Sequence, residues 1–141
     1  LKIQLPENSV IMDTGGYKGR FMNVTRSQIL KHAAYYLGVS PDNIVNEYGM
    51  TELSSQFYDA RGADIKPIPD WCRVAVLNPR THRMNEASGK GLLRIADLAN
   101  VWSFAFIQTE DVARLQPDGF QVLGRAEGSG LRGCSMDYEN K

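Results

Sequence analysis

The sequence lacks the features that mark several specialised classes of protein. Among its 141 residues, sixteen Lys and Arg are balanced by sixteen Asp and Glu, so bulk charge gives no support for a nucleic-acid or membrane-surface partner. It has no run of about eighteen apolar residues, the length needed to cross a bilayer. Its start has no basic segment followed by an apolar stretch. We therefore expect no nucleic-acid partner, no membrane span and no secretory signal.

Cysteine is also scarce, since Cys72 and Cys134 are the only two. Two widely spaced cysteines in a chain of this length do not form a disulfide framework, and they predict a reduced, cytoplasmic setting. The chain begins at Leu1 rather than Met, in the middle of what reads as a continuing segment. We therefore expect a fragment of a longer protein, with the N-terminal part of its own domain lying upstream.

The first part of the chain has the pattern of a strand, a helix and a second strand. An apolar run at Ser9–Asp13 predicts the first strand, and Ile44–Glu47 predicts the second. Between them, Thr25 and Gln28 fit a helix-capping box, and Gly38 stands where a left-handed C-cap belongs. The predicted apolar stripe of this helix is formed by Ile29, Ala33 and Leu37, flanked by Leu30 and Tyr36. The pattern is typical of a βαβ unit in a parallel sheet.

Beyond Asp59 the pattern changes to short β-like runs separated by turns. The predicted strands are Cys72–Leu77, Gly91–Ile95, Ser103–Gln108 and Phe120–Leu123, with turn clusters at Asn85–Gly91 and Gln116–Gly119. This spacing favours a small antiparallel sheet or barrel. We therefore expect an α/β fold in three parts. Residues 1–66 form a nucleotide-binding portion at the end of a parallel α/β sheet, residues 67–124 an antiparallel β subdomain, and residues 125–141 a hinge and mobile tail.

One stretch, Asn46–Glu52, concentrates side chains that suit a bound nucleotide. The ring of Tyr48 offers a face on which a purine can stack, and Gly49 lacks the Cβ that would keep backbone and ligand apart. The Thr51 hydroxyl can donate to a phosphate oxygen. The Glu52 carboxylate can hold a Mg²⁺ that also binds phosphates. The competing interpretation is a chance combination in an ordinary strand-to-loop segment.

Three stretches together resemble the signatures of the adenylate-forming (acyl-AMP-forming) enzyme superfamily. Asn46–Glu52 resembles its aromatic-Gly-x-Thr-Glu motif, Thr109–Asp111 its Thr/Ser-Gly-Asp motif, and Leu123–Arg125 the Gly-Arg element at its interdomain hinge. Their order and spacing match across nearly the whole chain. Within the superfamily, Thr14–Gly19 and Arg132–Ser135 are most similar to the acyl-protein synthetases, the fatty-acid ligases of bacterial bioluminescence.

The resemblance implies a role for each matching position. Tyr48 would stack on the adenine of ATP, Thr51 would contact the phosphate, and Glu52 would hold the magnesium. Asp111 would accept both ribose hydroxyls, a task that suits a carboxylate with about four lone-pair sites. Arg125 would lie near the ribose or phosphate as the hinge closes.

Two glycines and a cysteine complete the implied site. Gly15 and Gly16 follow the first predicted strand, at the sheet edge where ligands bind in open α/β sheets, and would wall the adenine and acyl pocket. Cys134 would carry the acyl group as a thioester, as a cysteine near the C-terminus does in the acyl-protein synthetases. The resemblance thus implies ATP and Mg²⁺ as cofactors, a carboxylic acid as substrate, and an acyl-carrier or reductase protein as partner.

Departures from the superfamily pattern leave three interpretations open. Glu110 stands in place of a glycine, and the chain shows neither the Ser/Thr/Gly/Lys-rich phosphate loop nor the lid with its catalytic lysine. The chain would then be the later half of the large domain and inactive alone. The interpretations are a ligase that transfers the acyl group to a protein thiol, a CoA ligase of the phenylacetate type, and a non-catalytic nucleotide-binding remnant.

Each nominated side chain also has a purely structural alternative. Tyr48 could pack under the sheet edge, Glu52 could stabilise a helix N-terminus, and Asp111 could cap a turn. Cys134 could be an unreactive cysteine in a glycine-rich tail. We expect Cys72, which leads an apolar run, to lie in the core.

Overall fold

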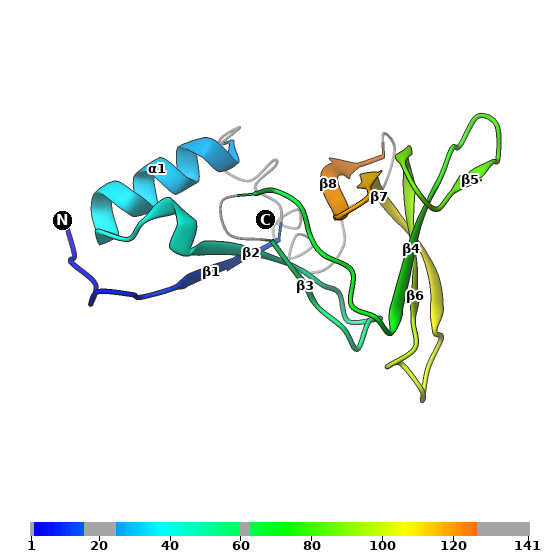
Figure 1. The fold of residues 1–141 in the computed structure, drawn as a ribbon, viewed down its shortest axis with the longest axis horizontal. Helices are drawn as coiled ribbons and strands as arrows, with labels where there is room; N and C mark the ends of the chain where they lie inside the picture. The colour runs from blue at the N-terminus through cyan, green and yellow to red at the C-terminus, as the bar shows by residue number, and fades with distance from the viewer. Residues whose placement is uncertain (1, 16–24, 60–62, 127–141) are drawn as a thin grey trace, which may run out of the picture.

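The computed structural model describes residues 2–15, 25–59 and 63–126, which form two β-sheets and one α-helix (Figure 1). One sheet has the strand order β1-β2-β3, and the other the order β5-β4-β6-β7-β8. The strands are β1 (Ile11–Thr14), β2 (Ile44–Tyr48), β3 (Phe57–Tyr58), β4 (Cys72–Leu77), β5 (Met84–Asn85), β6 (Gly89–Asp97), β7 (Phe106–Gln116) and β8 (Gly119–Arg125), and the helices are α1 (Arg26–Leu37) and the 3-10 helix η1 (Pro41–Asn43). The predicted fold class, a parallel α/β unit followed by an antiparallel β subdomain, is confirmed.

The βαβ unit forms because its local signals agree with one another. Strand β1 pairs in parallel with β2, from Ile11 opposite Ile44 to Thr14 opposite Glu47. The capping box that opens α1 is present, and Gly38 closes the helix in the left-handed region at φ 67°. No described helix is long and apolar enough to cross a membrane.

The predicted apolar stripe of α1 is wrong at Tyr36, whose side chain is 46% exposed. The helix buries no residue fully. Ile29, Leu30, Ala33 and Leu37 are each half-buried. The Tyr36 ring makes an edge contact with the neighbouring Tyr35 instead.

The second sheet is antiparallel throughout. Strand β4 has the predicted bounds, β6 and β8 extend beyond theirs at both ends, and β5 is not predicted. Strand β7 runs from Phe106 to Gln116 rather than over Ser103–Gln108, because the polar Thr109–Asp111 continues the strand toward its pairing with β8. The predicted turn cluster at Asn85–Gly91 is shorter, because Gly89 and Gly91 lie in β6. A Cβ at Gly91 would stand 2.2 Å from the backbone oxygen of Leu77, so this glycine allows two strands to approach closely.

The main apolar cluster among the described residues lies where the two sheets meet. Phe57 of β3 packs against Phe120 of β8 with ring centroids 5.1 Å apart. The other buried members of this core are Leu53, Cys72, Val74, Val76, Leu93, Ile95, Ala113 and Leu115. Cys72 is fully buried, as predicted. Because both sheets contribute to one core, the end of β2 lies beside the strands of the second sheet.

Candidate functional site

Tyr48 is the last residue of β2 and links the two sheets. Its hydroxyl donates a hydrogen bond of 2.7 Å to Oδ2 of Asp111 on β7. Its ring packs edge-to-face against Phe120, with centroids 5.9 Å apart, and is only partly buried. Burial of the phenol, followed by the nearby charge of Asp111, raises the pKa of Tyr48 well above its usual value. The phenol therefore remains a hydrogen-bond donor throughout the physiological pH range.

Asp111 is held by its neighbours on β7 and β8. Its backbone N–H donates to the Thr109 hydroxyl at 3.0 Å, and that hydroxyl donates to the backbone oxygen of Leu93 at 3.1 Å. Arg125 lies opposite Asp111 in the β7–β8 pairing, with its Nε 3.9 Å from Oδ1. The Arg125 guanidinium also forms an ion pair with Glu110. The carboxylate thus has partners on both oxygens and keeps spare lone pairs for further donors.

The position of Glu110 explains how the chain dispenses with glycine in this motif. The segment Thr109–Asp111 is a continuous part of β7, so no turn forms that would need glycine. The irregularity lies instead in the partner strand, where the β7–β8 register shifts between Val112 and Ala113 and Gly124 adopts φ 132°. Such a bulge re-aims the residues that follow it, and Arg125 is the next residue.

The turn after β2 carries the remaining residues of the motif. The backbone N–H of Leu53 donates to the Met50 oxygen at 3.0 Å, which closes a tight turn. Gly49, Thr51 and Glu52 are exposed on this turn. The structure therefore brings Tyr48, Asp111 and Arg125 into contact range, and it leaves Thr51 and Glu52 facing solvent on the adjoining turn.

Glu52 fits a metal that is shared with a ligand better than a site formed by protein alone. Among the described residues, no three His, Cys, Asp or Glu side chains gather closely enough to hold a metal ion. The backbone oxygen of Glu52 accepts a hydrogen bond from Asn100 at 2.9 Å, while its carboxylate has no partner within the described part of the chain. Mg²⁺ at nucleotide sites is commonly held by one or two carboxylates together with phosphate oxygens, and a single exposed carboxylate suits that arrangement.

The glycine of the first loop lies near the same sheet edge. Gly15 directly follows Thr14, which pairs with Glu47, so it stands beside the end of β2. It adopts φ 82°, and an added Cβ would meet no atom within 4 Å. Two other residues predicted for the site, Gly16 and Cys134, lie outside the described residues.

A buried ionic cluster next to this edge is not predicted by the sequence analysis. Asp59 and Lys66 are both buried, with Nζ 2.9 Å from Oδ1. Arg26, at the start of α1, forms an ion pair with Asp59 and lies 3.4 Å from Asp13 of β1. The available signal is Asp13 at the end of an apolar strand. Nothing in the sequence shows that Lys66 lies in the interior.

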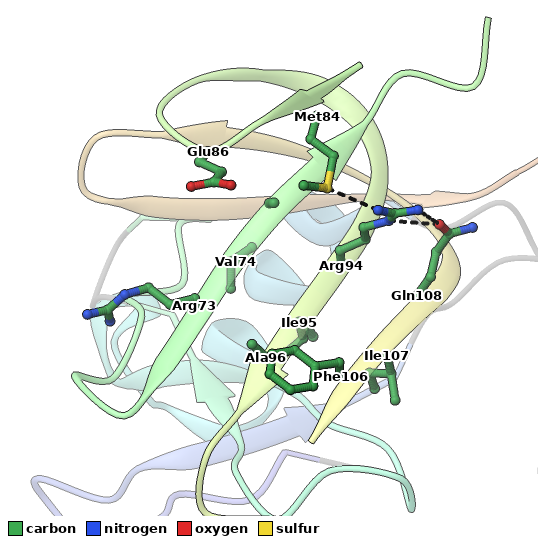
Figure 2. Close-up of a pocket in the computed structure, with 11 residues that line it drawn as sticks. Arg73, Val74, Met84, Glu86, Arg94, Ile95, Ala96, Phe106, Ile107 and Gln108 are labelled. Carbon is green, nitrogen blue, oxygen red and sulfur yellow. Dashed lines mark hydrogen bonds between the residues drawn. The ribbon is translucent and has the colours of Figure 1, made fainter. Parts of the chain in front are cut away.

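A pocket of about 630 Å³ lies elsewhere, beside β4, β6 and β7 (Figure 2). Arg94 donates from Nε and Nη2 to Oε1 of Gln108 at 2.8 and 2.6 Å, and from Nη1 to the Met84 sulfur at 3.0 Å. Arg94 pairs across the sheet with Ala75 and Gln108, and strand alternation puts these side chains on the face opposite the core. None of the residues predicted for the nucleotide site lines this pocket.

A scan of protein-family models gives no match to this sequence, and neither does a search of curated proteins. Solved structures, however, share the fold. Apo MatB from Rhodopseudomonas palustris matches with a TM-score of 0.58 at 15% identity over 84% of this chain and 26% of its own. McyG A-PCP complexed with phenylalanyl-adenylate gives 0.61 at 13% identity, over 89% of this chain and 23% of its own. A long-chain-fatty-acid-CoA ligase (FadD1) from Archaeoglobus fulgidus gives 0.56 at 15% identity, over 84% of this chain and 28% of its own.

These likenesses, at such low identity, establish the fold. The chain spans about a quarter of the length of each of the three structures.

Proposed function

We propose that this chain belongs to an enzyme that activates a carboxylic acid with ATP, giving acyl-AMP and pyrophosphate. The observation that carries the proposal is the meeting of Tyr48, Asp111 and Arg125 at the junction of the two sheets. These are the positions that the resemblance to adenylate-forming enzymes assigns to adenine, ribose and the hinge. The fold likeness to a fatty-acid-CoA ligase and to a structure that holds an aminoacyl-adenylate supports the same class of reaction.

The nucleotide would lie along this junction. Its adenine would stack on the exposed part of the Tyr48 ring, and its ribose hydroxyls would donate to the remaining lone pairs of Asp111. Arg125, which already reaches both acidic residues of the motif on β7, would lie near the ribose or phosphate. Gly15 and Gly16, after the neighbouring strand β1, would wall the adenine and acyl pocket of this nucleotide site.

The reaction itself depends on bringing two anions together. A substrate carboxylate must attack the α-phosphate, so positioning and charge neutralisation carry most of the catalysis. Thr51 would donate to a phosphate oxygen. Glu52 would hold Mg²⁺, which would supply positive charge to the phosphates. Both side chains are exposed on the same turn, where a bound triphosphate could reach them.

The acyl group of the adenylate would then pass to a thiol. We favour transfer of a fatty acyl group to the thiol of Cys134, because the residues around it resemble the acyl-protein synthetases. The chain after Arg125 would act as a hinge and tail that brings this thiol to the adenylate. The fold likeness to a fatty-acid-CoA ligase favours CoA as the second candidate acceptor.

Pyrophosphate release by the full-length protein, with a panel of fatty and aryl acids, tests the activation step. We expect ATP-dependent release with at least one acid, and a loss of at least about tenfold in kcat/KM for Glu52→Ala. Glu86→Ala is the matched control, because Glu86 lines the pocket beside β4, β6 and β7, which none of the predicted nucleotide-site residues lines. Absence of release with every acid, or full activity of Glu52→Ala, would overturn the proposal.

Radiolabelled acid tests the acceptor. An acyl label that stays on the protein through denaturing electrophoresis and is absent in Cys134→Ser would support the protein thiol. Label that appears only in CoA would support the second candidate.

A further inference from the structure

A buried carboxylate accepts hydrogen bonds from the segment that follows the turn after β2. This turn, which carries Gly49, Thr51 and Glu52, is called the motif turn below. Asp97, the last residue of β6, is fully buried. Its Oδ2 accepts hydrogen bonds from the backbone N–H of Ser54 at 3.0 Å and of Ser55 at 2.8 Å. Its Oδ1 accepts from the Ser55 hydroxyl at 2.8 Å and from the backbone N–H of Ala99 at 3.1 Å. Both carboxylate oxygens are therefore committed to donors, most of them from residues 54 and 55.

Asn100, just beyond Asp97, binds the same segment through its side-chain amide. Its Nδ2 donates to the backbone oxygen of Glu52 at 2.9 Å and to that of Phe104 at 3.1 Å. Its Oδ1 accepts from the Ser54 hydroxyl at 3.2 Å. The indole N–H of Trp71 also donates to the Ser55 hydroxyl, at 2.9 Å. The segment from Glu52 to Ser55 is thus tied by polar contacts to the turn after β6.

We propose that Asp97 and Asn100 are positioning residues that hold the motif turn in the shape needed to bind the nucleotide. This role rests on the proposed function. The turn lies outside both sheets, so its amides have no strand partner, and buried amides require an acceptor. The Asp97 carboxylate supplies that acceptor and Asn100 fixes the backbone at Glu52 itself. A turn fixed in advance avoids the ordering cost that a mobile one would incur on binding.

Asp97→Asn tests the role with almost no change in volume. The amide replaces one carboxylate oxygen with an N–H donor, which faces either the backbone N–H groups of Ser54 and Ser55 or that of Ala99, so in both orientations the four hydrogen bonds to residue 97 cannot all be kept. We expect backbone hydrogen exchange at Ser54 and Ser55 to become about tenfold faster or more, and AMP to bind about tenfold more weakly. Both are measured in the full-length protein, exchange without nucleotide and affinity by calorimetry with AMP. Asp118→Asn is the matched control, since Asp118 is exposed in the β7–β8 turn.

Ser55→Ala serves as a milder variant should Asp97→Asn fail to fold. It removes only the hydroxyl between Asp97 and Trp71 and leaves both amide hydrogen bonds in place, so we expect smaller changes in the same direction. Unchanged hydrogen exchange at Ser54 and Ser55 in these variants would show that the Asp97 hydrogen bonds do not restrain this backbone. Faster exchange with unchanged AMP affinity would overturn the positioning role alone. A parent protein that binds no adenine nucleotide would overturn the proposed function, and the positioning role with it.

Discussion

Gly49 separates, at the scale of a single residue, what folding needs from what a ligand needs. Its φ lies outside the left-handed region, and an added Cβ would meet only side-chain atoms, the nearest being Oε1 of Glu47 at 3.2 Å and Cγ of Gln56 at 3.4 Å. Both of these side chains can move. The fold therefore does not require glycine at this position, whereas a nucleotide lying against the backbone would.

Gly49→Ala should consequently weaken binding and spare the fold. We expect the free energy of unfolding to change by less than about 1 kcal/mol and AMP affinity to fall about tenfold. Urea denaturation and calorimetry measure the two effects. Gly119→Ala should lose stability, because Gly119 has φ 147° and its Cβ would stand 2.3 Å from the Lys66 oxygen. AMP affinity unchanged by Gly49→Ala would contradict the proposed path of the ligand.

The pH dependence of Asp97 provides a second prediction at this scale. Burial alone would raise its pKa, but the hydrogen bonds from Ser55, Ala99 and Ser54 together outweigh it and hold the pKa below the usual value. A carboxyl with a lowered pKa in the folded state stabilises the fold fully above its unfolded pKa of about 3.9. That contribution is lost as the pH falls through the folded pKa.

We expect acid unfolding of Asp97→Asn to be less steep below about pH 4 than that of the parent, because a group that binds protons on unfolding has been removed. Acid titration followed by circular dichroism measures the slopes. Equal slopes would show that the folded state does not lower the pKa of Asp97.

Asp59 links secondary-structure elements to one another. Its carboxylate pairs with Lys66 and with Arg26 of α1, and Arg26 also reaches Asp13 of β1. A buried ion pair is a weak source of net stability, but removal of Lys66 leaves the buried Asp59 carboxylate compensated only in part, by Arg26.

Lys66→Met should therefore lower the free energy of unfolding by about 3 kcal/mol. Lys90→Met, on an exposed lysine of β6, should change it by less than about 0.5 kcal/mol. The double variant Lys66→Met with Asp59→Leu should recover part of the loss, because the buried carboxylate left without its lysine is then removed as well. Urea denaturation of the variants measures these differences, and an additive double variant would contradict the pairing.

The elements that the sequence predicts well are those whose causes are local. The Thr25 cap, the Gly38 terminus and the β4 boundaries follow from neighbouring residues, and all are confirmed. The sequence predicts too short a strand β7 because Thr109–Asp111 is polar, and its strand pairing depends on β8. The burial of Lys66 is unpredictable for the same kind of reason, since the acid that neutralises it comes from a separate segment.

In the molecule as a whole, residues of both sheets pack in the same apolar core. The two sheets should therefore unfold together. Phe57 belongs to the first sheet yet packs among the buried residues of the second. Phe57→Ala should cost about 3–5 kcal/mol and should lower hydrogen-exchange protection in β2 and β6 alike.

Tyr58→Ala is the control for this prediction, because Tyr58 is adjacent on the same strand and 44% exposed. We expect it to cost less than about 1 kcal/mol. Loss of protection confined to one sheet in Phe57→Ala would show that the sheets unfold independently.

The candidate site is only partly predictable from sequence, because it joins residues from segments that are far apart in the chain. The motifs name Tyr48, Asp111 and Arg125, but the contact between residues 48 and 111 joins positions far apart in the chain. The contacts of Tyr48, Asp111 and Arg125 are observed. The roles of these three residues stay predictions, as do those of Thr51, Glu52, Cys134 and the glycines. Asp97 and Asn100 belong to no motif recognised in the sequence, and only the folded chain shows that they reach the motif turn.

Under the proposed function, the hydrogen bond from Tyr48 to Asp111 takes a place that a ribose hydroxyl would also use. The Tyr48 phenol already donates to the oxygen that a ribose hydroxyl would seek, so a nucleotide would enter by exchange with, or alongside, an existing donor. The Tyr48 hydrogen bond thus keeps the Asp111 carboxylate oriented before a nucleotide binds. A deoxyribonucleotide has one sugar hydroxyl fewer to donate to Asp111. It should therefore compete less well than a ribonucleotide with the Tyr48 phenol for that carboxylate.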